Sequence, residues 1–197
     1  MTATAARSLE EQRQEFARRR LVAMPLAGTL AWAAVGLGAP LLNTLQSGLL
    51  LFVATGSIFY LGVFISRFTG EHLLSPRHPK NEFDRLFMTG VAMSLAVYAI
   101  AIPFYLVQPD SLPLTVGILT GLMWLPVSWI LRHPVGWLHT GVRTVGVLAA
   151  WQAFPQARFE AVAAVIVAVY VVTLVVLERR WRCQQDTKMR AAMSAAA

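Results

Sequence analysis

Residues 161–177 read AVAAVIVAVYVVTLVVL, an apolar run without a charged side chain. A hydrocarbon core about 30 Å thick needs about 20 mostly apolar residues to be crossed by a helix. Five similar stretches come earlier in the chain, at 21–39, 48–66, 86–107, 112–131 and 135–154. The sequence therefore predicts an all-α, polytopic integral membrane protein, a bundle of six transmembrane helices. The run 161–177 is almost wholly aliphatic, which is typical of a lipid-facing helix.

The composition agrees with a membrane class and predicts one domain. Of 197 residues, 56% are hydrophobic and 14% are charged, whereas soluble domains carry about 25% charged residues. Ser8, followed by Glu10 and Glu11, predicts the start of a short charged helix, because these residues favour a helix N-terminus. We expect a cytoplasmic N-terminal segment over 1–20, the six-helix domain over 21–178 and a basic cytoplasmic tail over 179–197.

The formal net charge is +7, and the distribution of the basic residues along the chain predicts the topology. Lys and Arg lie before the first apolar stretch, between the second and third, between the fourth and fifth, and after the sixth. The gaps 40–47 and 108–111 hold none. Cytoplasmic loops carry the excess of basic residues, so both termini are predicted to be cytoplasmic. The expected partners are the lipid bilayer and its anionic headgroups, and no nucleic acid.

The stretch 135–154 differs from the others because it contains Arg143 near its middle. An arginine at the centre of a membrane helix costs about 2.5–3.5 kcal/mol on insertion scales, so it faces protein or water. His139 lies four residues earlier and shares a helix face with Arg143. Thr140 joins the same side, so the three residues form a candidate intramembrane binding site.

Two interpretations of Arg143 remain open. In the functional one, its planar guanidinium binds a phosphate or carboxylate, and His139 is a titratable neighbour. In the structural one, Arg143 satisfies helix carbonyls or pairs with an acid from the inner loop, where Glu71 and Asp84 are the candidate partners. It can also extend towards the membrane interface.

Gly117 and Gly121 stand four residues apart in the fourth stretch. This small-residue spacing lets membrane helices approach closely. We therefore expect these glycines to pack against another helix, either in the same chain or in a homo-oligomer.

The sequence contains no pattern for a cofactor or a metal. His72 and His78 share the inner loop with Glu71, Glu82 and Asp84, but their spacing matches no compact ligand motif. No phosphate-binding loop, dinucleotide fingerprint or pair of haem-ligating histidines is present. An intramembrane enzyme would have to use this loop together with His133. We expect no metal and no cofactor, and we favour a non-enzymatic role while leaving enzymatic activity open.

Two stretches carry a resemblance to a known family. They are TGSIF at 55–59, continued by FISR at 64–67, and GLMWLPVSW at 121–129. In these stretches the chain resembles a family of small bacterial six-helix membrane proteins catalogued as a domain of unknown function. The resemblance implies a bacterial inner-membrane location and six helices, and it carries no activity.

Three functions follow from these observations. The first is non-enzymatic binding or transport of a small solute or lipid through the helix bundle, which predicts a cavity at Arg143 and His139. The second is a structural or regulatory membrane subunit that acts by helix packing at Gly117 and Gly121. The third is an intramembrane enzyme such as a lipid-modifying transferase.

Overall fold

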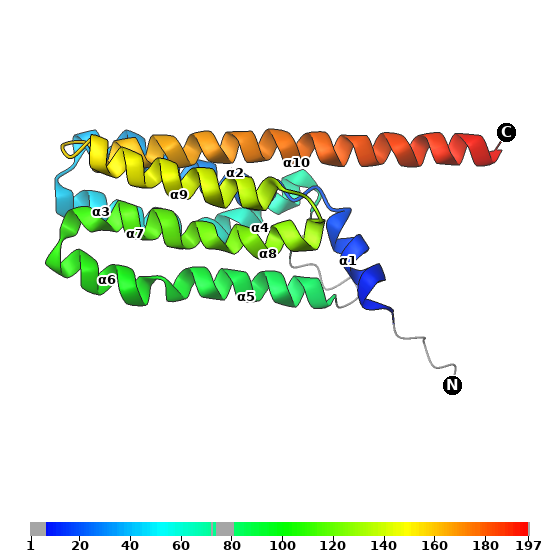
Figure 1. Ribbon diagram of the computed structural model, residues 1–197, viewed down its shortest axis with the longest axis horizontal. Helices are drawn as coiled ribbons and strands as arrows, with labels where there is room; N and C mark the ends of the chain where they lie inside the picture. Colours follow the sequence, from blue (N-terminus) through cyan, green and yellow to red (C-terminus); the bar gives the residue numbers. More distant parts are fainter. Residues whose placement is uncertain (1–6, 72, 74–80, 197) are drawn as a thin grey trace.

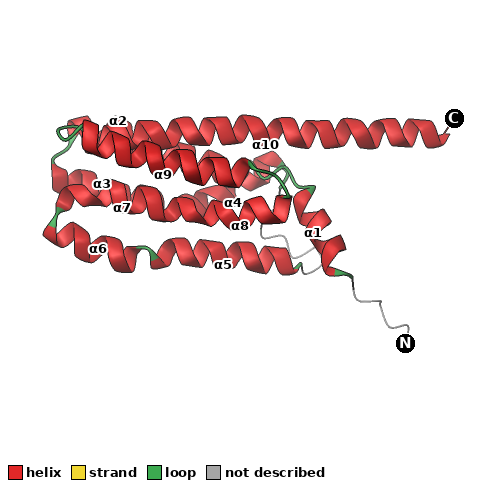
Figure 2. Ribbon diagram, viewed as in Figure 1, coloured by secondary structure: helices red, strands yellow, loops and turns green. Residues whose placement is uncertain are grey.

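The protein is described by a computed structural model covering residues 7–71, 73 and 81–196. All regular elements of these residues are helices, as the apolar pattern predicts (Figure 2). The α-helices are α1 (Leu9–Ala17), α2 (Ala23–Gly38), α3 (Thr44–Gly56), α4 (Ile58–Thr69), α5 (Glu82–Ala96), α6 (Tyr98–Val107), α7 (Leu112–Leu119), α8 (Trp124–Leu131), α9 (Val135–Ala153) and α10 (Arg158–Ala196). The 3-10 helices are η1 (Ala39–Leu41), η2 (Pro109–Ser111) and η3 (Thr120–Met123).

The longer helices run along one common direction, and α1 lies across one end of them (Figure 1). Helix α10 packs against α2 and α9, and α9 packs against α7 and α8. The fully buried apolar side chains gather between these helices: Trp32, Val35, Val116, Val147, Val162 and Ile166. The core therefore sits in the α2, α7, α9 and α10 part of the bundle.

The expectation that the run 161–177 faces lipid is wrong for one side of α10. Ile166 and Leu177 are buried against the neighbouring helices, whereas Val172 and Val175 are exposed. Helix α10 is also continuous over 39 residues, so no break separates the bundle from the tail expected to begin at 179. Its C-terminal part extends beyond the other helices (Figure 1).

Three of the predicted spans are interrupted, and in the third the break lies at Val97, between α5 and α6. Helices α3 and α4 meet at an angle of 45°, and the Ser57 hydroxyl at the break donates to the carbonyl of Ala54 at 2.8 Å. The fourth stretch tightens into η3 just before Pro126. Proline has no N–H to donate and disturbs the preceding helical turn, which explains why the interruption lies there.

The apolar helices indicate a membrane protein. Four segments of the described residues are long and apolar enough to cross a bilayer: 23–41, 82–107, 109–131 and 158–194. The bent pair α3–α4 adds a fifth if it forms one span. Helix α9, with 19 residues, is not among them because its polar residues lower its mean hydropathy.

Basic residues form hydrogen bonds and ion pairs between several helices at the end of the bundle that carries α1. The Arg13 guanidinium donates to the carbonyl of Ile130 at 2.8 Å, which joins α1 to α8. Arg20 pairs with Glu178 of α10 at 2.7 Å. Helix α1 itself starts with a capping box formed by Ser8 and Glu11, as the N-terminal sequence predicted.

Candidate functional site

Helix α9 carries the three predicted site residues on its inner side. Arg143 is completely buried, and His139 and Thr140 are buried beside it. Residues four apart lie on the same helix face, so the polar residues of α9 point together into the bundle. Val142 and Val145 lie on the outer side and are exposed. The shared inner side predicted for Arg143, His139 and Thr140 is therefore present in the structure.

The guanidinium of Arg143 donates hydrogen bonds to acceptors in three other elements. Its Nε donates to the carbonyl of Gly117 in α7 at 2.6 Å. Its Nη2 donates to the Thr120 hydroxyl in η3 at 2.9 Å, and its Nη1 donates to the Tyr170 hydroxyl in α10 at 3.3 Å. The Nε2 atom of His139 lies 3.4 Å from the same Nη1. Arg143 thus joins α7, η3, α9 and α10.

Aromatic rings cover the charge of Arg143. Its Cζ lies 5.8 Å from the centre of the Trp32 ring and 5.4 Å from that of Tyr170. A cation within about 6 Å of an aromatic face is attracted by the ring quadrupole. Among the described residues, no carboxylate bonds to this guanidinium. The buried cation is therefore stabilised by carbonyl, hydroxyl and aromatic groups without an anionic partner.

The hydrogen bonds determine the tautomer of His139. Its Nδ1 lies 2.8 Å from the Thr173 hydroxyl, and that hydroxyl donates its single proton to the carbonyl of Val169 at 2.8 Å. Thr173 must then accept, so Nδ1 of His139 carries the proton. The unprotonated Nε2 is left to accept from Arg143. The ring also stacks on Trp124, with centres 4.4 Å apart.

The glycines predicted to pack helices do so inside the chain. A Cβ at Gly117 would lie 3.2 Å from Val147 of α9 and 3.3 Å from Ile166 of α10. A Cβ at Gly121 would lie 2.9 Å from Cδ of Arg143. The carbonyl of Gly121 accepts from the Thr140 hydroxyl at 3.1 Å. These small residues therefore give α9 access to the backbone of α7 and η3.

The structure places the two acids predicted to pair with Arg143 elsewhere. Oε1 of Glu71 accepts from the backbone N–H groups of Val22 and Ala23, both at 2.9 Å. Helix α2 has no side-chain cap of its own, so Glu71 takes that role. Burial raises the pKa of the Glu71 carboxyl, and these backbone hydrogen bonds oppose the rise. Asp84 forms a bidentate pair with Arg19.

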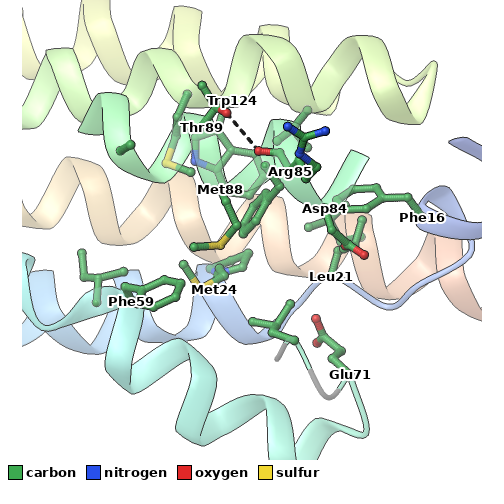
Figure 3. A pocket seen from close by; sticks show the side chains of 18 of the residues that line it. Phe16, Leu21, Met24, Phe59, Glu71, Asp84, Arg85, Met88, Thr89 and Trp124 are labelled. Carbon is green, nitrogen blue, oxygen red and sulfur yellow. Dashed lines mark hydrogen bonds between the residues drawn. The ribbon is translucent and has the colours of Figure 1, made fainter. Parts of the chain in front are cut away.

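A pocket with a volume of about 600 Å³ lies next to the Arg143 network. Apolar side chains from α2, α4, α5 and α8 line most of it, including Met24, Phe59, Met88 and Trp124 (Figure 3). Glu71, Asp84 and Arg85 line its end near Phe16 and Leu21 (Figure 3). The pocket is therefore apolar along its length and charged at the end that carries α1.

A smaller cavity of about 70 Å³ shares Met24, Phe59, Met123 and Tyr170 with the pocket. It also contains the hydroxyl-bearing residues Thr55, Ser94, Tyr98 and Thr120. Neither cavity is lined by Arg143 or His139 themselves. The network reaches the cavities only through its partners, because Tyr170 lines both and Thr120 lines the smaller one.

The inner loop shows no catalytic arrangement in its described residues. Glu82 pairs with Arg85 at 2.9 Å, and Nδ1 of His133 accepts from the N–H of Val135 at 3.2 Å. His72 and His78 lie outside the described residues. Within the described ranges, no group of three or more His, Cys, Asp or Glu side chains could hold a metal ion.

Sequence reasoning missed the contribution of α10 to the site. Tyr170 and Thr173 contact Arg143 and His139, and both are buried. A signal was present, because they are the only residues with hydroxyl groups in the aliphatic run 161–177. Trp32 and Trp124, which cover the network, lacked such a signal because aromatic residues are common in apolar spans.

Comparison with known proteins gives a family without an assigned activity. Searches of the curated proteins and of the solved structures found no match. A family model, described as a family of unknown function (DUF7010), matches residues 9–180. This range includes the Arg143 network and every described residue that lines the pocket. The chain therefore belongs to DUF7010, in agreement with the resemblance to a domain of unknown function noted in its sequence.

Proposed function

We propose that this protein is a multi-pass membrane protein that binds a lipid-like amphiphile in the pocket between α2, α4, α5 and α8, without catalysing a reaction. The observation that carries the proposal is the apolar pocket of about 600 Å³ with charged groups at one end. Its volume falls within the roughly 300–1,000 Å³ of small-molecule sites. An amphiphile matches a lining that is apolar along its length and charged at its end.

The lining also suits a flexible chain. Met24, Met88 and Met123 contribute to the pocket wall, and methionine adapts its shape to irregular apolar partners. Phe59 and Trp124 add broad apolar surfaces from opposite sides (Figure 3). A rigid polar solute would leave these surfaces without contacts, so an acyl or similar hydrocarbon chain is the better occupant.

The proposed topology has six membrane crossings in the cell (inner) membrane, with both termini in the cytoplasm. It adds α9 and the bent pair α3–α4 to the four apolar segments. Helix α9 can cross because its polar residues face the bundle, while Val142, Val145 and Leu148 are exposed on its outer side. The end that carries α1 and the contacts of Arg13 and Arg20 would face the cytoplasm.

Binding is the step that the pocket supports, and passage through the bundle needs a further opening. The Thr55 hydroxyl contacts the Tyr98 hydroxyl at 2.5 Å across the smaller cavity. This contact joins α3 to α6 and limits the cavity at that point. A transporter would have to separate these two side chains, so we propose transport only as a further step after binding.

Binding of oleyl alcohol to delipidated, detergent-solubilised protein tests the proposal by native mass spectrometry. Ala92→Trp places an indole on a pocket-lining position of α5. Met93→Trp adds the same group to an exposed position outside the pocket. We expect saturable binding to the wild type and to Met93→Trp, and at least a tenfold loss in Ala92→Trp. Equal binding to all three proteins, or no saturable binding, would overturn the proposal.

The alternative of a structural subunit loses the feature on which it was based. Gly117 and Gly121 are occupied by α9 and α10 of the same chain, so they offer no packing surface to a partner. The helices α5 and α6 are the least buried of the apolar segments, and they remain the surface through which such a subunit would act. A lipid bilayer covers such a surface equally well.

A further inference from the structure

We propose that the hydroxyl of Tyr170 is the ligand-binding donor of the pocket, and that the occupant is an anionic amphiphile whose carboxylate or phosphate oxygen accepts this hydrogen bond. The inference rests on the proposed function and specifies its ligand class. Arg143, directly behind Tyr170, would supply the balancing positive charge without touching the ligand.

Two branches of the hydrogen-bond network around Arg143 end at backbone carbonyls of the protein. Thr120 passes its proton to the carbonyl of Val116 at 2.6 Å, and the His139 branch ends through Thr173 at the carbonyl of Val169. Tyr170 accepts from Arg143. Among the described residues, its own O–H has no acceptor. Arg143 has five N–H groups, and four of them have acceptors among the described residues. One N–H of Arg143 and the O–H of Tyr170 are therefore left over, and of these two residues only Tyr170 lines the pocket.

The position of Tyr170 makes that donor available to a ligand. Tyr170 is 7% exposed, and it lines both the pocket and the smaller cavity. A buried hydroxyl whose proton lacks an acceptor is costly, and an oxygen in the adjoining space would satisfy it. The ligand's polar group would then sit at the junction of the two cavities, and its chain would extend past Met24 and Met88.

Charge selects an anionic group for this junction. Arg143 is completely buried, and buried charges are normally paired with an opposite charge. Its hydrogen-bond partners in the described residues are a carbonyl, two hydroxyls and an imidazole. An acidic oxygen bound to Tyr170 would be the nearest anion to this guanidinium, and donation by Arg143 makes the Tyr170 hydroxyl a stronger donor.

The charged end of the pocket is a poorer place for an acidic headgroup. Arg19 is paired with Asp84, and Arg85 is paired with Glu82. Glu71 adds a buried carboxyl at the same end. Every described cation that lines this end is already paired with an acid. An anionic group is therefore stabilised more beside Tyr170 and Arg143.

The test compares the wild type with Tyr170→Phe, using oleate, oleyl alcohol and inorganic phosphate as probes in native mass spectrometry. Loss of a hydrogen bond to a charged group corresponds to about tenfold in affinity or more. We expect Tyr170→Phe to weaken oleate binding about tenfold and oleyl alcohol binding at most about threefold. Phosphate alone should not bind measurably, because it lacks the apolar chain.

Tyr105→Phe is the matched control, because Tyr105 lies outside both cavities; it should leave all affinities unchanged. Equal losses for oleate and the alcohol in Tyr170→Phe, or no loss for either, would overturn the inference while leaving the proposed function intact. Phosphate binding as tight as that of oleate would show a free-anion site and overturn the amphiphile class. Failure of the wild type to bind either oleyl probe would overturn the proposed function itself.

Discussion

The apolar segments on the two sides of the bundle have similar hydropathy but differ in how much of their surface is buried inside the molecule. In the apolar segments 23–41, 109–131 and 158–194, 39% of the most apolar window is buried, whereas in 82–107 it is 11%. The first group encloses the Arg143 network. In the second, α5 forms one wall of the pocket, and Tyr98 at the start of α6 lines the smaller cavity. Hydropathy alone therefore does not distinguish a packing helix from one that faces a ligand or lipid.

Glycine positions show the same difference. A Cβ at Gly136 would lie 2.0 Å from the carbonyl oxygen of Trp124, and one at Gly121 would touch Arg143. A Cβ at Gly56 or Gly90, on the pocket side, would meet nothing within 4 Å. On the packed side, glycine is required by the close approach of α8 and α9. At Gly56 and Gly90 there is room for a larger residue, whereas a Cβ at Gly62 of α4 would lie 2.2 Å from Sδ of Met24.

The largest effect is expected for Gly136→Ala. The added methyl group collides with backbone atoms of α8, which cannot move as a side chain can, so we expect a loss of about 3 kcal/mol in the free energy of unfolding in detergent. Gly141→Ala on the same helix meets no neighbour and should be neutral or slightly stabilising. Similar losses in both variants would show that α8 and α9 do not approach as closely as described.

A smaller effect is expected for Gly121→Ala. Its methyl group displaces Cδ of Arg143, whose guanidinium is held by hydrogen bonds, so we expect a loss of about 1–2 kcal/mol. Gly56→Ala, beside the smaller cavity, should change stability by less than about 0.5 kcal/mol. Thermal unfolding of the two purified variants measures the difference. A neutral Gly121→Ala would mean that Arg143 moves freely, against the closed network.

Glu71 lies where the packed side and the pocket meet, because it caps α2 and lines the pocket. Removing the acceptor with Glu71→Ala should cost about 1 kcal/mol, the usual effect of losing a helix N-cap. Glu71→Gln keeps an acceptor for the N–H groups of Val22 and Ala23 and should retain most of the stability. Chemical unfolding of both variants at neutral pH makes the comparison, and equal losses would argue against the cap.

The pH dependence of Glu71 has a definite sign. Burial raises the pKa of its carboxyl in the folded protein, so the folded state holds the proton more tightly than the unfolded state. The resulting stabilisation is present below the unfolded pKa and is lost as the pH rises through the raised folded value. Relative to Glu71→Gln, the wild type should therefore lose stability as the pH increases from the unfolded pKa of Glu71 through its raised folded pKa. Parallel pH profiles would contradict the assignment.

The smallest effect is expected for Asp84→Asn. Asp84 pairs with Arg19 at the pocket end, and its side chain is 37% exposed. Pairs exposed to solvent contribute about 0–1 kcal/mol and weaken with salt. We expect a loss of about 0.5 kcal/mol at low ionic strength that disappears in high salt. A loss as large as that of Gly121→Ala would place this end of the pocket among the tightly packed parts.

The sequence predicted the helical architecture and the most unusual buried residue. The apolar stretches became helices, and the four-residue spacing of His139 and Arg143 placed both on the inner side of α9. These features depend on local periodicity, which is visible along the chain. The acceptors of Arg143 depend on long-range packing. The carbonyl of Gly117 has no sequence signal, whereas the hydroxyl of Tyr170 had one that was overlooked.

The pocket could not have been predicted from the sequence. A void depends on how far apart helices lie, and the residues that line it, such as Phe59 and Met88, resemble core residues elsewhere in the chain. The carboxylates Glu71 and Asp84 were considered as partners for Arg143 because they come from the inner loop. The structure uses them for nearer groups, since the N-terminus of α2 and the side chain of Arg19 lie closer to them.

The partners of Arg143 have a consequence for how the chain is made. Gly117 and Thr120 precede α9 in the order of synthesis, whereas Tyr170 follows it. A helix that leaves the ribosome with an arginine at its centre partitions poorly into lipid alone. For a chain inserted during translation, α9 would wait at the translocon until the aliphatic α10 emerges, and the two would enter the bilayer as a pair.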